Sequence, residues 1–239
     1  HRVYRRFDVG AAGAVHHRIG PGAAVFAERA DLWDRWGAGS VLDVAQSIGS
    51  GLAKAALAGI VDGRMVDTSF LLERDSQLAI ITDKSPEALD IVRHSTAHLL
   101  AYAVKELFPE AQVTIGPVIE NGFYYDIDLG GRSLSETEFK EIENKMTELA
   151  RQKNAYVRKE VSKQDAIAYF TEKNDEYKLD LLKDLADGSI TFYTQGNFTD
   201  LCRGPHIPDT GFIKAVKLLS VAGAYWRGNE KNKQLTRVY

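Results

Sequence analysis

Two short stretches, far apart in the chain, carry the side chains best suited to chemistry. The first, RHSTAHLLAYAVKELF, places His94 and His98 four residues apart, so that both project from one face of a helix. The second, DLCRGPH, places the only cysteine, Cys202, four residues before His206. The glycine and proline between them favour a loop. Three imidazoles and one thiol could therefore meet in one cleft.

Each pair alone has an ordinary interpretation, because histidines four residues apart also occur on protein surfaces and in packed cores. Two such pairs in a chain with only six histidines favour a functional site. Cysteine with histidine first suggests zinc, which takes four nitrogen or sulfur ligands in structural sites and three plus water in catalytic ones. The same residues without metal could hold a water and move protons during ester hydrolysis. The residues by themselves leave both alternatives open.

Composition sets broad bounds on what the chain can be. Its 239 residues suit one or two domains, and its hydrophobic content of 44% is ordinary for a soluble globular protein. The net charge of −3 argues against a generally basic nucleic-acid binder, although local basic patches remain compatible with it. One cysteine allows no intrachain disulfide, which suits a reducing compartment. No apolar run approaches the ~20 residues needed to cross a bilayer. We therefore expect a soluble cytoplasmic protein that does not contact membranes.

The N-terminal part of the chain predicts a small mixed module. Residues 1–38 show no sustained period; two strands at 3–9 and 14–19 are the most they suggest, and we assign them no chemistry. After them, Ser40 is expected to cap the helix VLDVAQSI, which Gly49 and Gly51 would end. Strands are expected at 55–61, 64–66 and 77–82, the first two joined by an Asp-Gly turn. This order predicts a ubiquitin-like α+β module that ends near residues 84–86.

The rest of the chain predicts a larger α+β domain with an antiparallel sheet and packed helices. An amphipathic helix at 86–108 would carry the histidines, with Ser85 as its cap and Pro86 in its first turn. A Ser135–Glu138 capping box would open the next helix, which ends near residue 153. Later helices are expected after Ser162, with Ala166, Ile167 and Phe170 inward, and around 177–185. Strands are expected at 113–119, 123–129, 189–194, 214–220 and 234–239. Hairpins with grouped helices indicate α+β rather than a βαβ arrangement.

Four separated motifs, RHSTAHLL, IGPVIENGFYYDID, DLCRGPHIP and AGAYWRGNEKNKQLTRVY, resemble the N-terminal region of bacterial threonyl-tRNA synthetases. The resemblance covers residues 40–239. It implies an unassigned segment at 1–38, a ubiquitin-like TGS module at 39–84 and an editing domain at 85–239. In the family, that domain hydrolyses serine wrongly attached to threonine tRNA, which is therefore the expected partner. The aminoacylation and anticodon-binding domains, through which the full-length enzyme is expected to form a homodimer, would lie outside this stretch.

The resemblance also implies a set of site residues. The catalytic ones are His94, His98, Lys178, Cys202 and His206. Those that bind substrate are Gly116, Tyr125, Asp200 and Arg203. His94 would orient or deprotonate water, Lys178 would place positive charge near the ester, and Asp200 would bind the ammonium or hydroxyl group of serine. From its sequence surroundings alone, Lys178 is instead expected to be a solvent-exposed helix lysine. Arg203 could hold a phosphate or pair with Asp200.

Two questions stay open on the sequence. Related editing proteins for alanine tRNA hold zinc with the same His/Cys pattern, whereas the resemblance to the threonyl enzyme implies hydrolysis without a required cofactor, which we expect. If zinc binds, its ligands would be His94, His98, Cys202 and His206. The alternative function is a TGS-containing module that binds RNA or a partner, with a structural His/Cys cluster. A basic patch could then comprise Arg151, Lys153, Arg158, Lys159 and Lys163.

Overall fold

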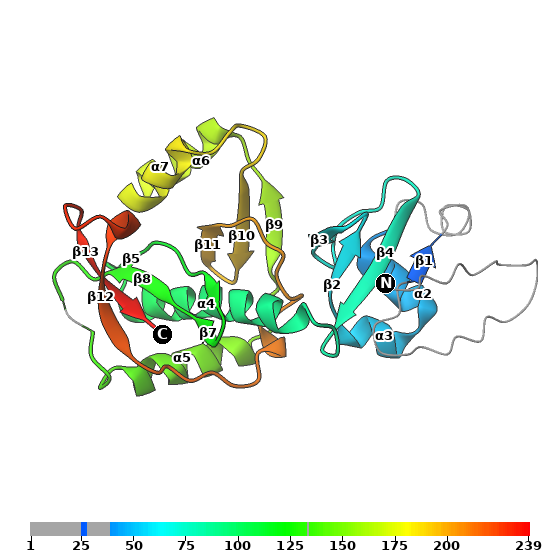
Figure 1. Ribbon diagram of the computed structural model, residues 1–239, viewed down its shortest axis with the longest axis horizontal. Coiled ribbons are helices and arrows are strands. Elements are labelled where there is room, and N and C mark those ends of the chain that lie inside the picture. The colour runs from blue at the N-terminus through cyan, green and yellow to red at the C-terminus, as the bar shows by residue number, and fades with distance from the viewer. Residues whose placement is uncertain (1–24, 28–38, 133) are drawn as a thin grey trace, which may run out of the picture. The chain divides into compact units, whose positions relative to one another are not determined.

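The computed structural model describes residues 25–27, 39–132 and 134–239 (Figure 1). The strands suggested at 3–9 and 14–19 lie outside this range. The chain forms two compact units. The first comprises His1–Ile91 and Pro205–Pro208, and the second comprises Val92–Gly204 and Asp209–Tyr239. The module boundary expected near residues 84–86 stays a prediction. Among the described residues, no helix is both long and apolar enough to span a membrane.

The described residues of the first unit form a four-stranded antiparallel sheet and two helices, with the strand order β1-β4-β2-β3. Its elements are β1 (Val25–Ala27), α2 (Val41–Ile48), α3 (Ser50–Ala55), β2 (Ala56–Val61), β3 (Arg64–Val66) and β4 (Ser76–Thr82). Ser40 caps α2 in a complete capping box with Asp43, as the sequence predicts. The apolar side of α2 packs on the sheet, with Val41 and Val44 in one buried cluster with Leu78. The expected end at Gly51 is wrong, because the chain continues into α3 after Gly49.

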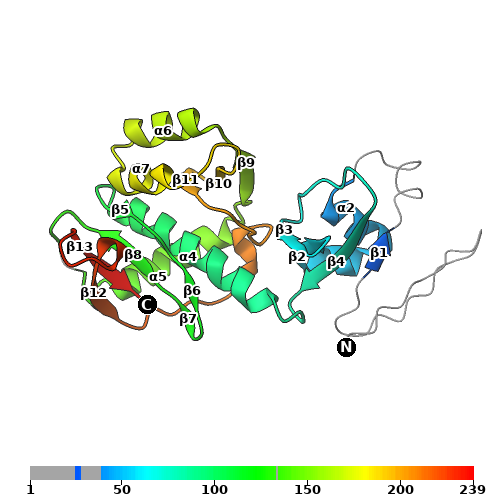
Figure 2. The ribbon, with the colours of Figure 1, turned by 45° about the horizontal axis from the view of Figure 1, so that its top comes forward.

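The second unit is built from three antiparallel sheets and four α-helices (Figure 2). The sheets have the strand orders β12-β13-β8-β5, β11-β10-β9 and β6-β7. The strands are β5 (Gln112–Val113), β6 (Val118–Ile119), β7 (Gly122–Phe123), β8 (Tyr125–Asp128), β9 (Val157–Glu160), β10 (Thr191–Gln195), β11 (Phe198–Leu201), β12 (Val221–Tyr225) and β13 (Gln234–Val238). The helices are α4 (Ala88–Leu107), α5 (Phe139–Arg151), α6 (Lys163–Glu172) and α7 (Glu176–Lys183), with two 3-10 turns, η1 (Thr210–Phe212) and η2 (Trp226–Gly228). The predicted α+β class is confirmed.

Helix α4 runs through the middle of the second unit in both ribbon views (Figures 1 and 2). All of its residues from 95 to 104 are buried. An amphipathic helix with one polar side was therefore the wrong expectation for this stretch, because a helix surrounded by protein is apolar on every side. A polar residue on this helix must find its hydrogen-bond partners inside the protein. This applies to His98, which is buried.

Several expected boundaries differ from the structure. The strand expected at 214–220 is wrong: this segment is not a strand, and the backbone N–H of Leu218 donates to the Glu143 carboxylate 2.9 Å away. The sheet strand begins only at Val221, where the antiparallel register with β13 starts. The strand expected at 123–129 is broken at Tyr124 into β7 and β8. Pairing partners, which a single sequence does not show, decide both cases.

Helix starts also differ. Helix α4 begins at Ala88, two residues after Pro86, although Ser85 is used locally by accepting the N–H of Thr82. Helix α5 begins at Phe139, and only half of the expected capping box forms: the Ser135 N–H donates to the Glu138 carboxylate, while the Ser135 hydroxyl also donates to it instead of accepting the Glu138 N–H. Ile167, expected to point inward, is 42% exposed. Strands β9 and β11 were not expected.

Candidate active site

The two histidines of α4 lie one helical turn apart, as their spacing predicts. Their ring centroids are 5.2 Å apart and the rings meet edge to face. His98 is buried, whereas His94 is only partly buried. Burial is the largest influence on His98 and lowers its pKa to about 3, because a charged imidazole is poorly solvated there. His98 is therefore a neutral imidazole near pH 7, and His94 is the more accessible of the two.

The β10–β11 hairpin brings the thiol to these histidines. Gly196, with φ +58°, makes the tight turn between the strands, and the register places Tyr193 opposite Asp200. Directly after β11, the Cys202 N–H still donates to the carbonyl of Thr191. The Cys202 Sγ then lies 3.3 Å from Nε2 of His94 and also accepts the N–H of Gly204. A hydrogen-bonded hairpin thus sets the position of the thiol.

Gly204 is required by the loop that follows Cys202. Its φ of +69° lies in the left-handed region that side chains avoid, and a Cβ there would come within 1.9 Å of the Tyr193 hydroxyl. The glycine in DLCRGPH is therefore required both for the turn and because a side chain would clash with Tyr193. It lets the backbone pass over the Tyr193 ring.

The four predicted metal-ligating side chains do come together. One ligand atom each from His94, His98, Cys202 and His206 lies within 4.8 Å of all the others. Zinc–ligand bonds of ~2.0–2.3 Å in a tetrahedron would separate the ligand atoms by roughly 3.5 Å, so zinc would require only a modest contraction. The donor set fits zinc, which would supply a Lewis acid and an activated water when bound. It equally fits a metal-free site in which the thiol and imidazoles position water.

A second set of predicted residues forms a buried ionic network. The Lys178 Nζ lies 2.6 Å from the Asp200 carboxylate, and each side chain is only 2% exposed. Nζ also donates to the carbonyl of Thr114 at 2.7 Å, and the Tyr125 hydroxyl donates to the other Asp200 oxygen at 3.0 Å. The Leu201 N–H donates to the same carboxylate. Because a buried charge is costly unless it is paired and hydrogen-bonded, these contacts are what hold both charges in place.

This network and the histidines influence one another. The charge of Asp200 raises the pKa of His98, while those of His94 and Lys178 lower it, although burial is the stronger effect. Burial also raises the pKa of Tyr125 well above its usual value, and the neighbouring Asp200 adds to this. The Tyr125 hydroxyl therefore stays protonated and donates to Asp200. The charges of Asp200 and Lys178 thus act on the His98 imidazole, while the joint role of the two groups in one site stays a prediction.

Two expectations drawn from sequence surroundings are wrong. Lys178 is not a solvent-exposed helix lysine, because α7 turns it inward onto Asp200 and Thr114. The pairing considered between Arg203 and Asp200 is also wrong, since Asp200 is buried and forms its ion pair with Lys178. Arg203 is exposed. Its phosphate-binding role stays a prediction.

Gly116 and Tyr125 were predicted together as pocket-lining residues, and the structure places them in contact. A Cβ at Gly116 would lie 2.3 Å from Cδ2 of the Tyr125 ring. The glycine therefore allows the ring to pack against the backbone of the segment between β5 and β6. Tyr125 is 1% exposed, so its ring is held between this backbone and the Asp200 carboxylate. Their lining of an amino-acid pocket stays a prediction.

Three neighbours of the site were missed. The Thr114 carbonyl accepts the Lys178 ammonium, and no pattern marks a single backbone carbonyl in advance. The Tyr156 hydroxyl donates to the Ser95 carbonyl, 2.8 Å away on the histidine helix. Tyr193 packs under Gly204. Strand alternation in TFYTQ places Tyr193 on the side of the sheet opposite Phe192. Its pairing with Asp200 could be predicted only if β11 were recognised as the partner strand.

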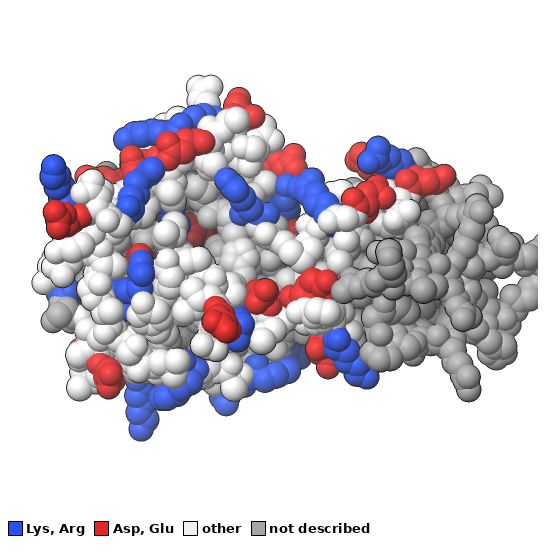
Figure 3. Space-filling model, in the orientation of Figure 1, with Lys and Arg blue, Asp and Glu red and all other residues white. Residues whose placement is uncertain are grey.

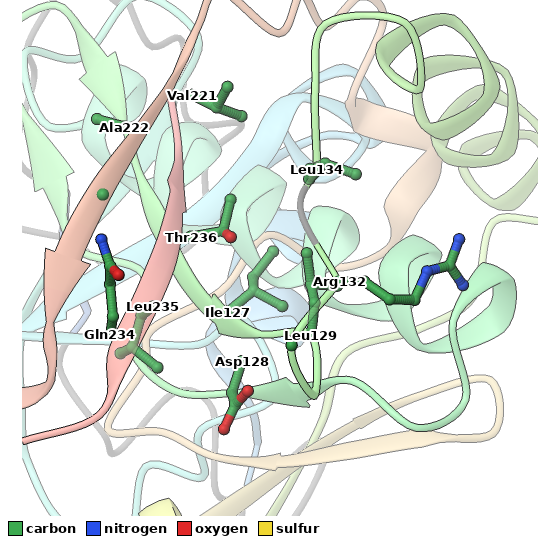
Figure 4. Close-up of a pocket in the computed structure, with 12 residues that line it drawn as sticks. Ile127, Asp128, Leu129, Arg132, Leu134, Val221, Ala222, Gln234, Leu235 and Thr236 are labelled. Carbon is green, nitrogen blue, oxygen red and sulfur yellow. The ribbon is translucent and has the colours of Figure 1, made fainter.

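One cavity in the second unit, of about 400 Å³, lies between the end of β8 and the β12–β13 pair, and none of the predicted site residues lines it (Figure 4). The Arg132 side chain points away from the other labelled residues in that view. Another cavity, of about 330 Å³, is lined by Cys202 and Arg203 together with Thr191 and with Leu181 of α7. This cavity therefore lies next to the candidate chemistry.

The proposed basic patch is not a single surface. Its central residues lie on β9, where Arg158 and Lys159 point to opposite faces. Arg158 pairs with Glu160, and Lys163 donates to the carbonyl of Leu185. On the face shown in Figure 3, basic and acidic side chains are intermingled around a largely uncharged centre. The structure thus gives no continuous basic stripe on that face.

Comparison with known proteins places these features in a family context. Residues 34–82 match the TGS domain, and residues 190–239 match the threonyl and alanyl tRNA synthetase second additional domain. The threonine–tRNA ligase of Polynucleobacter necessarius subsp. necessarius is 61% identical over 200 residues, 83% of this chain and 31% of that protein. The Cytophaga hutchinsonii ligase is 60% identical over 198 residues, with the same two shares.

The chain thus spans about a third of these relatives, at 31% of their length. The resemblance deduced from the four motifs is confirmed, since both domain types are present. The chain carries a TGS domain followed by the second additional domain of threonyl and alanyl tRNA synthetases, and it corresponds to the region of threonine–tRNA ligases that contains them.

Proposed function

We propose that the second unit hydrolyses the ester of threonine tRNA mischarged with serine. The observation that carries this proposal is the buried Lys178–Asp200–Tyr125 network beside His98, close to a thiol–imidazole pair. Burying a lysine–aspartate pair is a poor way to gain stability, because desolvation offsets much of the attraction. Strongly perturbed groups of this kind concentrate at functional sites. The similarity to threonine–tRNA ligases supplies the substrate class.

A separate hydrolytic site has a physical reason. Serine lacks one methyl group of threonine, and a missing methyl is worth only ~1–3 kcal/mol of discrimination in a binding pocket. A ligase that must discriminate more strongly than this needs a second site that selects between the two amino acids. A second pocket that admits serine and excludes threonine by its methyl group provides it.

The reaction is attack of water on the ester carbonyl carbon, followed by cleavage of the bond to the tRNA ribose oxygen. His94 is the partly exposed imidazole beside Cys202, so we assign it the role of the general base that accepts a proton from the attacking water. That proton then passes to the departing ribose oxygen. The products are free serine and uncharged tRNA.

The buried network provides the electrostatics of the step. Two of the three Lys178 ammonium protons are directed at Asp200 and Thr114, and the third would face the developing oxyanion. A carboxylate accepts about four hydrogen bonds, and three go to Lys178, Tyr125 and Leu201. Asp200 can therefore still accept one from the ammonium or hydroxyl group of serine.

The test is turnover of seryl-tRNA by the whole chain. We expect more than one ester cleaved per protein molecule, and a rate at least ~10²-fold lower in His94→Ala, the usual contribution of a general base. Because His94 is only partly buried, this variant should keep the circular dichroism spectrum of the parent. Lys217→Ala, which removes an exposed charge on a different segment, is the control and should retain the rate. Stoichiometric tRNA binding without cleavage would instead favour the RNA-binding alternative.

A further inference from the structure

We propose that Arg227, in the turn between β12 and β13, is a positioning residue that holds α7 so that Lys178 reaches the ester. This inference rests on the proposed hydrolysis for its kinetic consequence. Its structural part can be tested independently of that function. It concerns the WRG portion of the motif AYWRGNEKNKQLTRVY, which carries no role in the reaction described above.

Helix α7 depends on contacts with other elements for its position, among them the packing of Leu182 in a buried cluster with Phe170. It is eight residues long, and a helix of that length is marginal without tertiary contacts. Asp175 caps its start by accepting the N–H of Lys178. Lys178 lies in the first half of this helix, so small rotations of α7 would move the ammonium away from Asp200. Something outside the helix must therefore fix it.

The turn supplies that attachment with several directed contacts. The Arg227 guanidinium donates from Nε to Asp180 at 2.7 Å and from Nη1 to Asp184 at 2.7 Å. Its Nη2 also donates to the backbone carbonyl of Asp180, in the last turn of the helix. This carbonyl is one of the terminal ones that a helix leaves without internal partners. The cation thus satisfies a carbonyl at the end of the helix where positive charge is favourable.

Trp226 strengthens the same attachment. Its indole N–H donates to the Asp180 carboxylate at 3.0 Å, and its ring packs edge to face on Tyr177, with centroids 5.0 Å apart. Tyr177 in turn donates to Asp128 at 2.6 Å. Tyr177, Asp180 and Asp184 are spaced three and four residues apart, so they lie on one side of the helix. The turn therefore contacts one side of α7, and Lys178 projects from a neighbouring side into the site.

The backbone conformation of Arg227 indicates that the surrounding contacts hold this residue in place. Its φ is +54°, a left-handed conformation that is unfavourable for a residue with a side chain. Such conformations persist where the surrounding contacts over-determine them, and they concentrate at functional sites. From this turn the guanidinium contacts both Asp180 and Asp184.

Two readouts test the inference. The first is the side-chain ammonium of Lys178, observed by nitrogen-15 NMR of lysine-labelled protein. In the parent chain, burial and two hydrogen bonds should make this signal visible and slow to exchange with water. In Arg227→Ala we expect it to broaden or vanish, while Arg227→Lys keeps part of it. The control Lys217→Ala, which removes a different exposed ion pair, should leave the signal unchanged.

The second readout is deacylation of seryl-tRNA. Arg227→Ala should lower kcat about tenfold with KM within twofold, because the helix carries an ammonium that acts on the reacting ester. In a Lys178→Ala background the same change should cost less than twofold, since Arg227 acts through Lys178. Multiplicative losses in the double variant would overturn the inference. So would a folded Arg227→Ala variant in which the Lys178 signal stays protected.

The outcomes separate this inference from the proposed function. If the parent chain cleaves no seryl-tRNA, the proposed function fails, while the NMR comparison still decides whether Arg227 positions Lys178. If Arg227→Ala does not fold, Asp180→Asn removes the charged partner while keeping the shape of the side chain. A folded Asp180→Asn variant with an unchanged Lys178 signal would then overturn the inference.

Discussion

The most informative single residue is Lys178, because its surroundings in the sequence suggest the opposite of its position in the structure. In EYKLDLLK it is one of two lysines on a short polar helix, which indicates a solvated side chain. Its burial is decided by Thr114 and Asp200, both distant in sequence. Residue types therefore could not reveal the ion pair. Only the resemblance to the synthetase family pointed to Lys178 as a site residue.

The stability of the second unit should depend on keeping this ion pair whole. Lys178→Met leaves the Asp200 carboxylate buried and without its counter-charge, so we expect a loss of about 3 kcal/mol in the free energy of unfolding. Lys178→Met with Asp200→Asn removes both charges and should recover more than half of that loss. Urea unfolding of the two variants measures the difference. Equal losses would show that the unpaired charge is not what destabilises the first variant.

The four-residue His/Cys group gives a prediction about metal. We propose that hydrolysis needs no bound metal, because the Cys202 thiol is already positioned by the Gly204 N–H and His94. Protein treated with a strong chelator should then keep its deacylation rate within about twofold, with metal content checked by elemental analysis. Loss of activity that added zinc restores would establish the opposite. Bound zinc that can be removed without loss would mark a structural ion.

At the scale of elements, the sequence predicted those parts that depend on local signals. Ser40 and Ser162 cap their helices, and the Asp-Gly turn joins β2 and β3, because caps and turns depend on adjacent residues. The strands β9 and β11 were missed, and β12 was expected at the wrong residues, for the opposite reason. Val157 on β9 is 57% exposed and the strand is otherwise charged, so pairing with β10 alone defines it. Such edges leave little hydrophobic pattern to read.

The loop after β11 offers a test of how far local backbone geometry controls the site. Gly204→Ala combines an unfavourable φ of +69° with a clash at the Tyr193 hydroxyl. Gly188→Ala is a matched control, because its φ is +81° but nothing lies near the added Cβ. We expect Gly188→Ala to cost about 1 kcal/mol of unfolding free energy and Gly204→Ala about 1–3 kcal/mol more. The deacylation rate should fall only in Gly204→Ala, since that loop holds Cys202. Similar effects of both changes would mean that the clash is relieved without moving the loop.

At the scale of the whole molecule, the site draws on segments that are widely separated along the chain. His94 comes from α4, Tyr125 from β8, Lys178 from α7 and Asp200 from β11. His94, Tyr125 and Asp200 lie in recognisable motifs and Lys178 does not, and spacing along the chain says nothing about how these segments meet. The His/Cys group was predicted because its two pairs are local patterns. The network of Lys178, Asp200 and Tyr125 required the fold to bring three elements together.

If the proposed hydrolysis holds, this assembly predicts selectivity for serine over threonine. The Tyr125 ring is held between the Gly116 backbone and Asp200, so a wall made from it cannot easily yield to an extra methyl group. A steric clash in such a packed wall can exceed the ~1–3 kcal/mol that a missing contact provides. We therefore expect seryl-tRNA to be deacylated at least ~100-fold faster than threonyl-tRNA at equal concentration.

Tyr125→Phe keeps the ring in place but loses the hydrogen bond to Asp200, so it should slow the reaction while retaining the preference for seryl-tRNA. Tyr125→Ala should reduce the preference itself. Equal rates for the two charged tRNAs in the parent chain would show that this site does not distinguish them by the methyl group, and the proofreading function would have to be abandoned.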